Sequence, residues 1–344
     1  MEKTRLKVFK TLFYIFLFLG ILIGSPEAQP PIQEKKDKPA GQATIRVGVS
    51  QIQVDVTVQN KDGNLIRGLQ PEHFKVYEDK IQQKIINFSP VQASMTAVLL
   101  VEYSSYIVNN LSYRAGWEML YEAWLASRLF VNDMRQEDWI ALIAYDLNSE
   151  ILVDFTQDPH EVNHAISKLR YPGFSESNFY DAVIDTLDRL EEVEGKVSIV
   201  LVTTGLDSFS KANLGKLLKR VKNTNVTIYA VGLGGNFLAR NDFQISGTVR
   251  LDFQQAEAIL KAITKSTGGA AYFPRFTTGY PKIFKNISTL VRSRYSLSYI
   301  SSNTQENKKF RKLRIKVEVD VDGNGKPDKL KVLHKEGYYP GNNK

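Results

Sequence analysis

The stretch Ala97-Val98-Leu99-Leu100-Val101 is a continuous apolar run. A strand with one face in solvent would interrupt such a run with polar residues, whereas a strand buried on both faces of a parallel sheet would not. An amphipathic segment follows at about 111–133, with the spacing of a helix that packs back against the sheet. This stretch therefore predicts one unit of a parallel sheet covered by helices.

The same strand-then-helix unit repeats along the chain. Further apolar runs lie at 139–144, 151–153, 197–202 and 226–231, and helical patterns lie at 159–170, 179–194, 210–223, 253–266 and 281–293. Strands that alternate with helices of this length are typical of a doubly wound sheet. We predict an α/β fold with a doubly wound, mostly parallel sheet at 95–294. The polar stretch 233–252 is predicted to be a long surface loop.

Residues on both sides of this region alternate between apolar and polar instead. The alternation runs through 45–58 before it and through 295–299, 313–319 and 330–334 after it. A period of two with β-branched residues predicts strands. Because a β segment of about 45 residues is only marginally stable alone, we expect the segments 44–94 and 295–344 to pair. The α/β domain would then be inserted into one β-sandwich built from both ends of the chain.

The first 28 residues differ from the rest. Basic residues open the chain and an apolar run follows at 12–23. A membrane-spanning helix needs about 20 apolar residues, so this shorter run is nearer the core of a signal peptide. We predict a signal peptide at 1–28 and a flexible linker at 29–43, which makes the protein secreted, periplasmic or cell-surface. An uncleaved N-terminal membrane anchor is the alternative.

Composition narrows the class of protein. The chain has 344 residues, of which 43% are hydrophobic and 24% are charged, and these fractions exclude collagen-like and wholly disordered chains. It has no cysteine, which excludes disulfides and thiolate metal sites. The net charge of +8 is spread along the chain. A modest basic cluster comprises Lys308, Lys309, Arg311, Lys312 and Arg314. We interpret it as a solvated strand edge, so we expect no nucleic-acid partner.

Polar side chains follow the predicted central strands. Glu102 and Ser104 come directly after 97–101, Ser177 precedes the predicted helix at 179–194, and Thr204 follows 197–202. In an open doubly wound sheet, ligands bind beyond the carboxyl ends of the strands. Hydroxyl and carboxylate oxygens are the ligands that Mg²⁺ and Ca²⁺ prefer. The sequence therefore predicts that these side chains meet at one edge of the sheet and suit a hard cation.

Short motifs spread along the chain carry a family resemblance. They are Val54-Asp-Val-Thr-Val58, Lys61-Asp-Gly63, Gly68-Leu69, Phe74-Lys-Val-Tyr-Glu-Asp79, Asn178-Phe-Tyr-Asp-Ala182, Arg294-Tyr-Ser-Leu-Ser-Tyr299 and Gly337-Tyr-Tyr-Pro340. By these motifs, 95–294 resembles a von Willebrand factor type A (VWA) domain, and 44–340 resembles the acidobacterial VWFA-related proteins. The resemblance implies a Rossmann-like α/β fold and a metal-ion-dependent adhesion site.

That adhesion site normally uses Asp-x-Ser-x-Ser, a Thr from a middle loop and a late Asp. By resemblance these positions fall on Glu102, Ser104, Tyr106, Ser177 and Thr204. Tyr106 offers no short hydroxyl and Thr204 no carboxylate, so one carboxylate remains of two, which weakens the binding of a hard cation. Two interpretations stay open. One is a degenerate site without metal; the other is a weak Mg²⁺ or Ca²⁺ site in which Glu176 or Asp207 substitutes for the missing carboxylate.

Residues 320–328 form a second candidate metal site. Oxygen-bearing side chains stand at the calcium-loop positions 1, 3, 5 and 9; they are Asp320, Asp322, Asn324 and Asp328. Gly325 occupies position 6, but Lys331 stands where a bidentate Glu belongs. Asp-Gly and Asn-Gly pairs are also common hairpin turns. A calcium-binding turn and an ordinary hairpin turn both remain open.

The segment His160-Glu-Val-Asn-His164 matches the zinc-peptidase pattern HExxH. The chemistry would need both imidazoles on one helix face and Glu161 as general base. Asp158 and Pro159 instead place the motif at the first turn of a helix. We expect that turn to face solvent, and a zinc-dependent metallopeptidase using 160–164 is the alternative function.

The sequence as a whole favours a non-catalytic, extracytoplasmic, adhesion-type VWA-domain protein. Its partner would be another protein or an envelope ligand, bound by the loops at 102–106, 174–178 and 204–208. No nucleic acid is expected to bind, and membrane contact is expected only through the N-terminal segment.

Overall fold

The computed structural model describes residues 51–104, 113–169, 176–240, 245–305, 307, 309–321 and 323–340. All of them belong to one compact unit, Gly48–Lys344. The predicted signal peptide (1–28) and linker (29–43) lie outside the described residues. Within the described ranges, no helix combines the length and hydrophobicity that crossing a bilayer requires.

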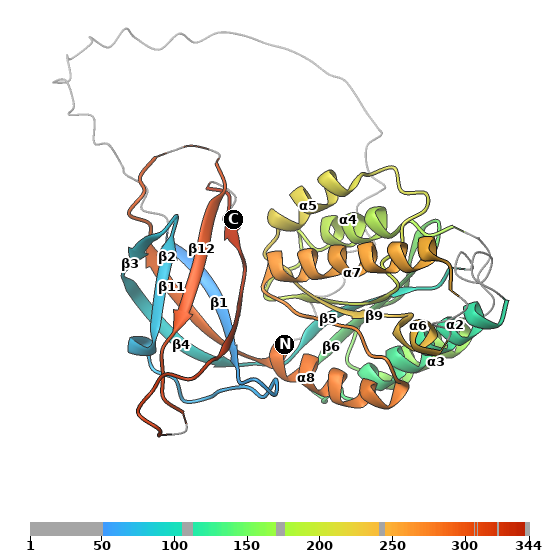
Figure 1. The fold of residues 1–344 in the computed structure, drawn as a ribbon, viewed down its shortest axis with the longest axis horizontal. Coiled ribbons are helices and arrows are strands. Elements are labelled where there is room, and N and C mark those ends of the chain that lie inside the picture. The colour runs from blue at the N-terminus through green and yellow to red at the C-terminus, as the bar shows by residue number, and fades with distance from the viewer. Residues whose placement is uncertain are drawn as a thin grey trace, which may run out of the picture. The chain divides into compact units, whose positions relative to one another are not determined.

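A six-stranded sheet forms the centre of the α/β region (Figure 1). Its strands, in spatial order, are β10 (Ala271–Tyr272), β9 (Thr227–Gly232), β8 (Ser198–Thr203), β5 (Thr96–Glu102), β6 (Trp139–Tyr145) and β7 (Ser149–Thr156). Neighbouring strands are parallel except for β6 and β7, an antiparallel pair at one edge. The mostly parallel sheet predicted from the sequence is therefore confirmed.

Helices cover both faces of this sheet (Figure 1). One face packs against α2 (Tyr113–Val131), α3 (Pro159–Lys168) and α8 (Tyr280–Arg292); the other packs against α4 (Phe179–Arg189), α5 (Leu214–Lys222) and α7 (Gly247–Thr267). Along β5, Leu99 and Val101 face the first set, and Val98 and Leu100 face the second. Because successive strand side chains point to opposite faces, a strand covered on both sides needs the continuous apolar run seen in the sequence.

The stretch 233–252 differs from the long loop predicted from the sequence. It contains α6 (Gly235–Arg240) and the first turns of α7. Phe237 of α6 and Phe253 of α7 pack with Met119 of α2 in a small apolar cluster. Ser246 caps α7 by accepting a hydrogen bond from the backbone N–H of Val249, 3.3 Å away. A serine before a helix is a common start signal, and the prediction passed over it.

Strands from both ends of the chain form two further four-stranded sheets. One contains β13 (Lys331–His334), β1 (Gln51–Gln59), β11 (Ser293–Ile300) and β4 (Ile85–Gln92); the other contains β14 (Gly337–Tyr338), β12 (Arg311–Val317), β2 (Phe74–Glu78) and β3 (Ile81–Gln83). β1 pairs with β11 and β13, and β2 pairs with β12. Apolar side chains from both sheets share one core, and they include Val54, Val56, Phe74, Leu297 and Ile315. The predicted sandwich is confirmed.

Short 3₁₀ helices lie at Pro71–His73 and Thr277–Gly279.

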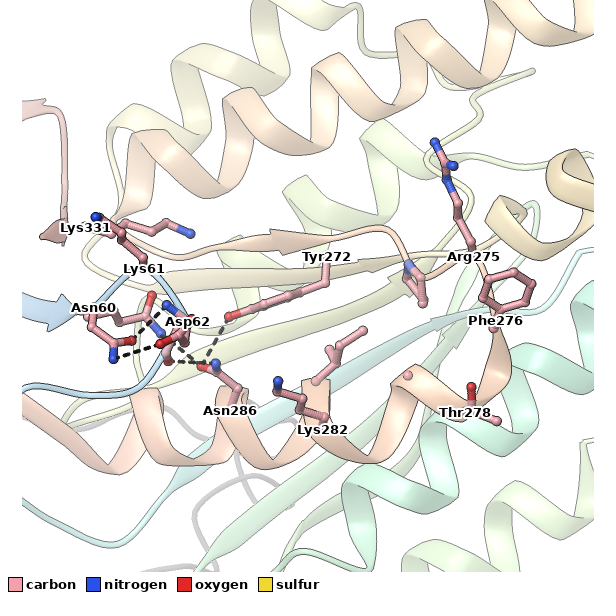
Figure 2. A pocket seen from close by; sticks show the side chains of 15 residues that line it. Asn60, Lys61, Asp62, Tyr272, Arg275, Phe276, Thr278, Lys282, Asn286 and Lys331 are labelled. Carbon is pink, nitrogen blue, oxygen red and sulfur yellow. Dashed lines mark hydrogen bonds between the residues drawn. The ribbon is translucent and has the colours of Figure 1, made fainter. Parts of the chain in front are cut away.

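The sandwich contacts the α/β domain at the N-terminal ends of the parallel strands. Asp55 of β1 pairs with Lys196, just before β8, at 2.5 Å. On α8, the side-chain amide of Asn286 donates to the carbonyl of Gly63 at 3.0 Å and accepts from the side-chain amide of Gln59 at 3.1 Å (Figure 2). We call this region of contact between the sandwich and the α/β domain the seam. The opposite edge of the sheet, where the parallel strands end, is not part of the seam. We call that opposite edge the rim; its described residues are 103–104 after β5, 176–178 before α4 and 204–213 after β8.

A short connection, residues 334–336, joins β13 to β14 and crosses the end of α7. The backbone N–H of Glu336 donates to the carbonyl of Ser266 at 3.2 Å, and the Ser266 hydroxyl donates to the Glu336 carboxylate at 3.2 Å. Gly268 lies directly beneath, with φ +83°, and a Cβ there would stand 2.8 Å from the carbonyl carbon of His334. Only glycine suits both that backbone conformation and that close approach.

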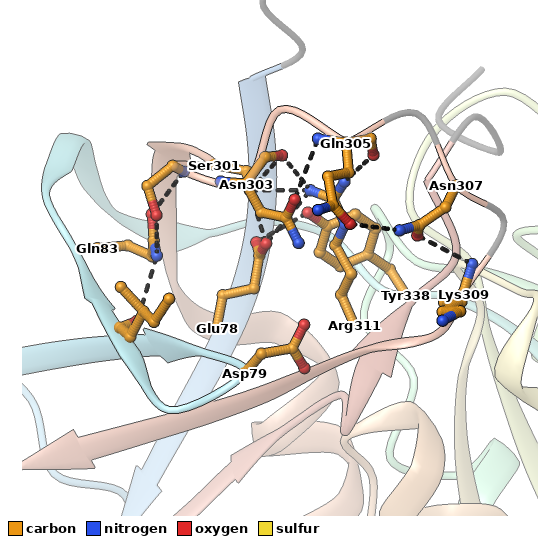
Figure 3. A network of polar contacts seen from close by, with 12 residues as sticks. Glu78, Asp79, Gln83, Ser301, Asn303, Gln305, Asn307, Lys309, Arg311 and Tyr338 are labelled. Atoms are coloured by element: carbon orange, nitrogen blue, oxygen red, sulfur yellow. Dashed lines mark hydrogen bonds and ion pairs between the residues drawn. The ribbon is translucent and has the colours of Figure 1, made fainter.

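A buried carboxylate joins the two ends of the chain inside the sandwich (Figure 3). Glu78 of β2 is 2% exposed and accepts hydrogen bonds from the hydroxyls of Tyr338 (2.8 Å) and Ser301 (2.6 Å). It accepts a third from the hydroxyl of Tyr299 at 2.7 Å. It also pairs with the guanidinium of Arg311 at 3.3 Å. Arg311 is buried, which corrects its place in the predicted solvated strand edge. The alternation of β12 is the physical reason, because Arg311 shares the inward face with Leu313 and Ile315.

Candidate functional site

The rim gathers the polar residues that the sequence predicts to meet. Glu102 is the last residue of β5, and Ser104 follows two residues later. Thr204 directly follows β8, and Ser177 lies just before α4. Because β5 and β8 are adjacent and parallel, their carboxyl ends deliver these loops to one place.

All these side chains contact one carboxylate. Oε1 of Glu102 accepts from the hydroxyls of Ser104 (3.2 Å) and Ser177 (3.1 Å), and the Ser177 hydroxyl shares its one proton with the carbonyl of Leu206 (3.2 Å). Oε2 accepts from the hydroxyl of Thr203 (2.9 Å) and from the hydroxyl (2.8 Å) and backbone N–H (2.7 Å) of Thr204. Glu102 and its four donor residues are each at most 2% exposed. We call this arrangement the Glu102 cage.

A second layer of hydrogen bonds orients the cage. Since the Thr203 hydroxyl donates to Glu102, it accepts from the hydroxyl of Tyr145 (2.7 Å) and from the backbone N–H of Gly205 (2.8 Å). Burial, and next the nearby charge of Glu102, raise the pKa of Tyr145 well above its usual value, so its hydroxyl keeps its proton at neutral pH. The sequence places Thr203 just after an apolar run but gives it no role in the site, and it gives no signal for Tyr145, the last residue of β6.

The resemblance implies a divalent cation here, and the described donors do not fit one as they are placed. Mg²⁺ and Ca²⁺ need about six or more oxygen ligands with free lone pairs. The one carboxylate already accepts five hydrogen bonds, and the hydroxyls of Ser104, Ser177 and Thr204 aim their protons at it. A cation would have to break these bonds and would meet no second negative charge at Thr204. Tyr106, the remaining position of the motif, lies outside the described residues.

The two carboxylates considered as substitutes have other partners. Asp207 accepts from the backbone N–H of Tyr180 in the first turn of α4 (3.0 Å) and from the hydroxyl of Ser210. Burial is the main cause that raises the pKa of Asp207. Glu176 accepts from the hydroxyl of Ser208 at 2.7 Å. Both acids thus brace the loop 204–213 against α4, and neither has a hydrogen bond to the cage in the described part of the chain.

The surface around the cage is partly apolar. Phe209, on the loop after β8, is 65% exposed. A cavity of about 520 Å³ lies beside Thr204 and is bordered by Leu238 of α6, Phe253 of α7 and Arg275. The size lies within the usual range of ligand pockets, about 300–1,000 Å³. The rim therefore offers both a projecting aromatic side chain and a hollow next to the cage.

The candidate calcium turn is described except for Asp322, which lies outside the described residues. The carboxylate of Asp320 accepts from the backbone N–H groups of Gly323 (2.7 Å) and Gly325 (2.6 Å). Asp328 accepts from the backbone N–H of Val321 at 2.8 Å, and Asn324 accepts from that of Lys326 at 2.9 Å. These bonds shape a turn, and calcium binding there stays a prediction.

The HExxH segment lies at the start of α3. Asp158 caps the helix by accepting from the backbone N–H of His160 at 2.8 Å. His160, Glu161 and His164 are exposed, while Val162 faces the core. No cluster of three His, Cys, Asp or Glu side chains suited to a metal occurs among the described residues. The geometry gives the zinc-peptidase alternative no support.

No protein-family model and no curated protein matches the chain. Among solved structures, the chain is similar to an aerotolerance-related membrane protein from Bacteroides fragilis (15% identity, 58% of this chain and 98% of that chain, TM-score 0.41). It is also similar to the vWF domain of the type V pili tip protein Mfa5 from Porphyromonas gingivalis (13%, 58% and 96%, TM-score 0.43). A third is the PilB minor pilin from Streptococcus sanguinis (11%, 59% and 63%, TM-score 0.42). Because these identities and TM-scores are low, the similarities give no information about function. The fold is assigned from the order of the strands.

Proposed function

We propose that this protein is a non-catalytic, extracytoplasmic binding protein that holds another protein or an envelope ligand at the rim without a metal ion. The observation that carries the proposal is the Glu102 cage. Five donors satisfy the carboxylate at the place where the VWA resemblance puts a cation. Glu102 occupies a position that would ligate metal in an adhesion site, and here it instead holds the neighbouring rim residues in place.

A buried carboxylate without its hydrogen bonds is costly. Glu102 therefore ties Ser104 after β5, Ser177 before α4, and Thr203 and Thr204 at the end of β8 to one point. Residues that are already held in place lose little entropy on binding, which leaves more of the contact energy for affinity. Phe209 projects from the loop after β8, and exposed aromatic side chains are frequent anchors of protein interfaces. A partner with an apolar pocket for Phe209 and groups that enter the neighbouring cavity fits this surface.

The extracytoplasmic location is part of the proposal and rests on the N-terminal sequence. The basic start, the apolar run at 12–23 and the following linker favour export, either with cleavage or with an N-terminal anchor. Membrane contact is proposed only through that segment. The finer resemblance to acidobacterial VWFA-related proteins agrees with this location and stays a prediction.

Calorimetric titration of the full chain with millimolar Mg²⁺ or Ca²⁺ tests the absence of metal at the rim. We expect no heat that depends on Ser177 or Thr204, so wild type and the Ser177→Ala and Thr204→Ala variants should give the same trace. Heat in the wild type that disappears in both variants would show an adhesion site that holds metal. That result would overturn the proposal.

Pull-down from an envelope extract of the source organism tests the binding surface. A partner retained by the wild type should be lost with Phe209→Ala and retained with Ile81→Ala, a matched exposed apolar residue on β3 of the sandwich. Retention should be the same with and without a chelator. Loss on chelation, or equal retention by both variants, would contradict binding at a metal-free rim.

A further inference from the structure

A second cavity, of about 510 Å³, lies between the sandwich and the α/β domain, apart from the Glu102 cage (Figure 2). Its walls are the turn after β1, the end of β10, the segment 274–279 and one face of α8. Tyr272, Pro274, Phe276 and Ile283 provide apolar surface, and Phe276 is 64% exposed. We call this cavity the seam pocket. Its size is that of a site for a small organic ligand.

The charged side chains around the seam pocket are mostly cationic. Lys61 comes from the turn, Lys282 from α8 and Lys331 from β13, while Asp62 is the one acid among the lining residues. None of the three lysines forms an ion pair with a described residue. Lys285, one turn further along α8, does pair with Asp133 at 3.2 Å. Three unpaired cations drawn from three separate elements therefore surround one cavity.

The framework that carries these cations is fixed by hydrogen bonds. Asn286 accepts from the hydroxyl of Tyr272 at 3.3 Å and donates to the carbonyl of Gly63 at 3.0 Å. The turn that holds Lys61 is thus tied to α8, which holds Lys282. Burial raises the pKa of Tyr272 to about 12, so the phenol stays neutral and adds no negative charge to the wall. Among the lining residues the negative charge of Asp62 is then outnumbered by the positive charges of the lysines.

From this geometry we propose that the seam pocket binds a small organic anion. Its carboxylate or phosphate group is held by Lys61, Lys282 and Lys331, and its ring or apolar body lies against Tyr272 and Ile283. Lysine ammonium groups act as donors to such anions, and charge-assisted bonds are the stronger ones. The proposal is separate from the rim function, because none of these residues touches the Glu102 cage. Arg275, which also lines the cavity beside Thr204, is not required by it.

Calorimetric titration of the full chain with four probes tests the proposal, the probes being benzoate, phenyl phosphate, inorganic phosphate and benzyl alcohol. We expect the two ring-bearing anions to bind, inorganic phosphate to bind more weakly and the neutral alcohol not to bind. The stronger of benzoate and phenyl phosphate identifies the preferred anionic group. Binding of benzyl alcohol as tight as that of benzoate, or no binding of either ring-bearing anion, would overturn the proposal.

Matched variants separate a built site from general positive charge. Lys61→Ala combined with Lys282→Ala should weaken the ring-bearing anions about tenfold or more, as the loss of two charge-assisted contacts implies. Lys216→Ala combined with Lys219→Ala removes the same charge from the exposed surface of α5 and should leave affinity unchanged. Ile283→Ala should weaken phenyl phosphate but not inorganic phosphate. Equal weakening by the two lysine pairs would show a nonspecific charge effect and overturn the site.

Discussion

Glu102 holds a negative charge in the interior by hydrogen bonds alone. It is 1% exposed and forms no ion pair within the described ranges. A buried charge usually requires an opposite charge or a full set of hydrogen bonds, and here hydroxyl and backbone N–H donors supply the set. In a metal site, the ligand oxygens would turn free lone pairs toward the cation. In this cage the hydroxyl protons point toward the protein's own carboxylate instead.

Glu102→Gln is expected to destabilise the fold. The amide nitrogen of glutamine cannot accept, so the amide oxygen must take the Oε2 side, where the backbone N–H of Thr204 donates. The Ser104 hydroxyl then faces a donor and loses its acceptor. Each buried unsatisfied group costs about 1–3 kcal/mol. Urea denaturation at pH 7 measures the difference, and Glu150→Gln, at an exposed position on β7, should stay within about 0.5 kcal/mol of the wild type. Equal stability of Glu102→Gln and the wild type would contradict the cage.

Asp138 and Arg292 form a buried ion pair that makes stability depend on pH. Burial by itself would raise the pKa of Asp138, but hydrogen bonds from Arg292 and from the backbone N–H groups of Arg135 and Met95 outweigh it and lower the pKa. The pair therefore stabilises the fold above the unfolded pKa of Asp, about 3.9. That stabilisation is lost as the pH falls through the lower pKa of the folded state.

Asp138→Asn should remove this acid dependence and leave Arg292 buried without its partner. A loss of about 3–5 kcal/mol is expected at pH 7, with a smaller difference from the wild type near pH 3. Denaturant melts across pH 3–7 measure both quantities. Asp154→Asn, an exposed position on β7, is the control and should follow the wild-type profile. A constant difference between Asp138→Asn and the wild type at all pH values would refute the assigned pKa direction.

At the scale of elements, β2 depends on strands that follow it by more than 200 residues. Tyr299 of β11 and Tyr338 of β14 both donate to Glu78 of β2. Burial, and next the hydrogen bond to Glu78, raise the pKa of Tyr299, so the phenol remains a donor at any ordinary pH. The network therefore links the last strands of the chain to one of the first.

Tyr299→Phe removes one donor from this network while it keeps the ring in the core. We expect a loss of about 1–3 kcal/mol, because the buried Glu78 then lacks one hydrogen bond. Tyr77→Phe on the neighbouring position of β2, where the side chain is partly exposed, should change stability by less than about 0.5 kcal/mol. Thermal or urea unfolding compares the two. If both variants behave alike, the Glu78 network does not stabilise the sandwich.

The sequence predicts most helices and strands, because the spacing of apolar residues distinguishes strands covered on both faces from strands covered on one. The run at 97–101 indicates a strand covered on both faces, and the alternation at 45–58 indicates a strand covered on one. It also predicts that Glu102, Ser177 and Thr204 meet, since parallel strands end at a common edge. The prediction does not include Thr203 as a donor or Arg311 as buried. The role of Thr203 depends on the direction of a hydroxyl, which residue type does not give. The burial of Arg311 follows if the alternation of Leu313 and Ile315 is continued two residues back, a signal that the prediction did not use.

At the scale of the whole molecule, the sandwich and the α/β domain meet through polar contacts near the last strands. His334 ends β13 and belongs to the connection that crosses α7. Its Nε2 accepts from the backbone N–H of Ile315 at 3.2 Å, and its Nδ1 lies 2.8 Å from the carbonyl of Lys335, to which it donates. This arrangement requires the neutral imidazole, because a protonated ring has no acceptor for the N–H of Ile315.

Because the bond to Ile315 joins β13 to β12, protonation of His334 is expected to destabilise the sandwich in mild acid. Burial lowers its pKa, with the backbone of Lys335 and the charge of Glu336 opposing that shift. A histidine in the unfolded chain has a pKa of about 6.5, so the unfolded state binds the proton first as the pH falls. Stability is then fully present above about pH 6.5 and declines below it, down to the pKa of the folded state. In His334→Gln, whose side chain does not titrate, the midpoint of urea unfolding should change little between pH 5 and 7. His164→Gln, at an exposed position of α3, should show the same decline as the wild type. A decline of the same slope in His334→Gln would place the acid sensitivity elsewhere in the molecule.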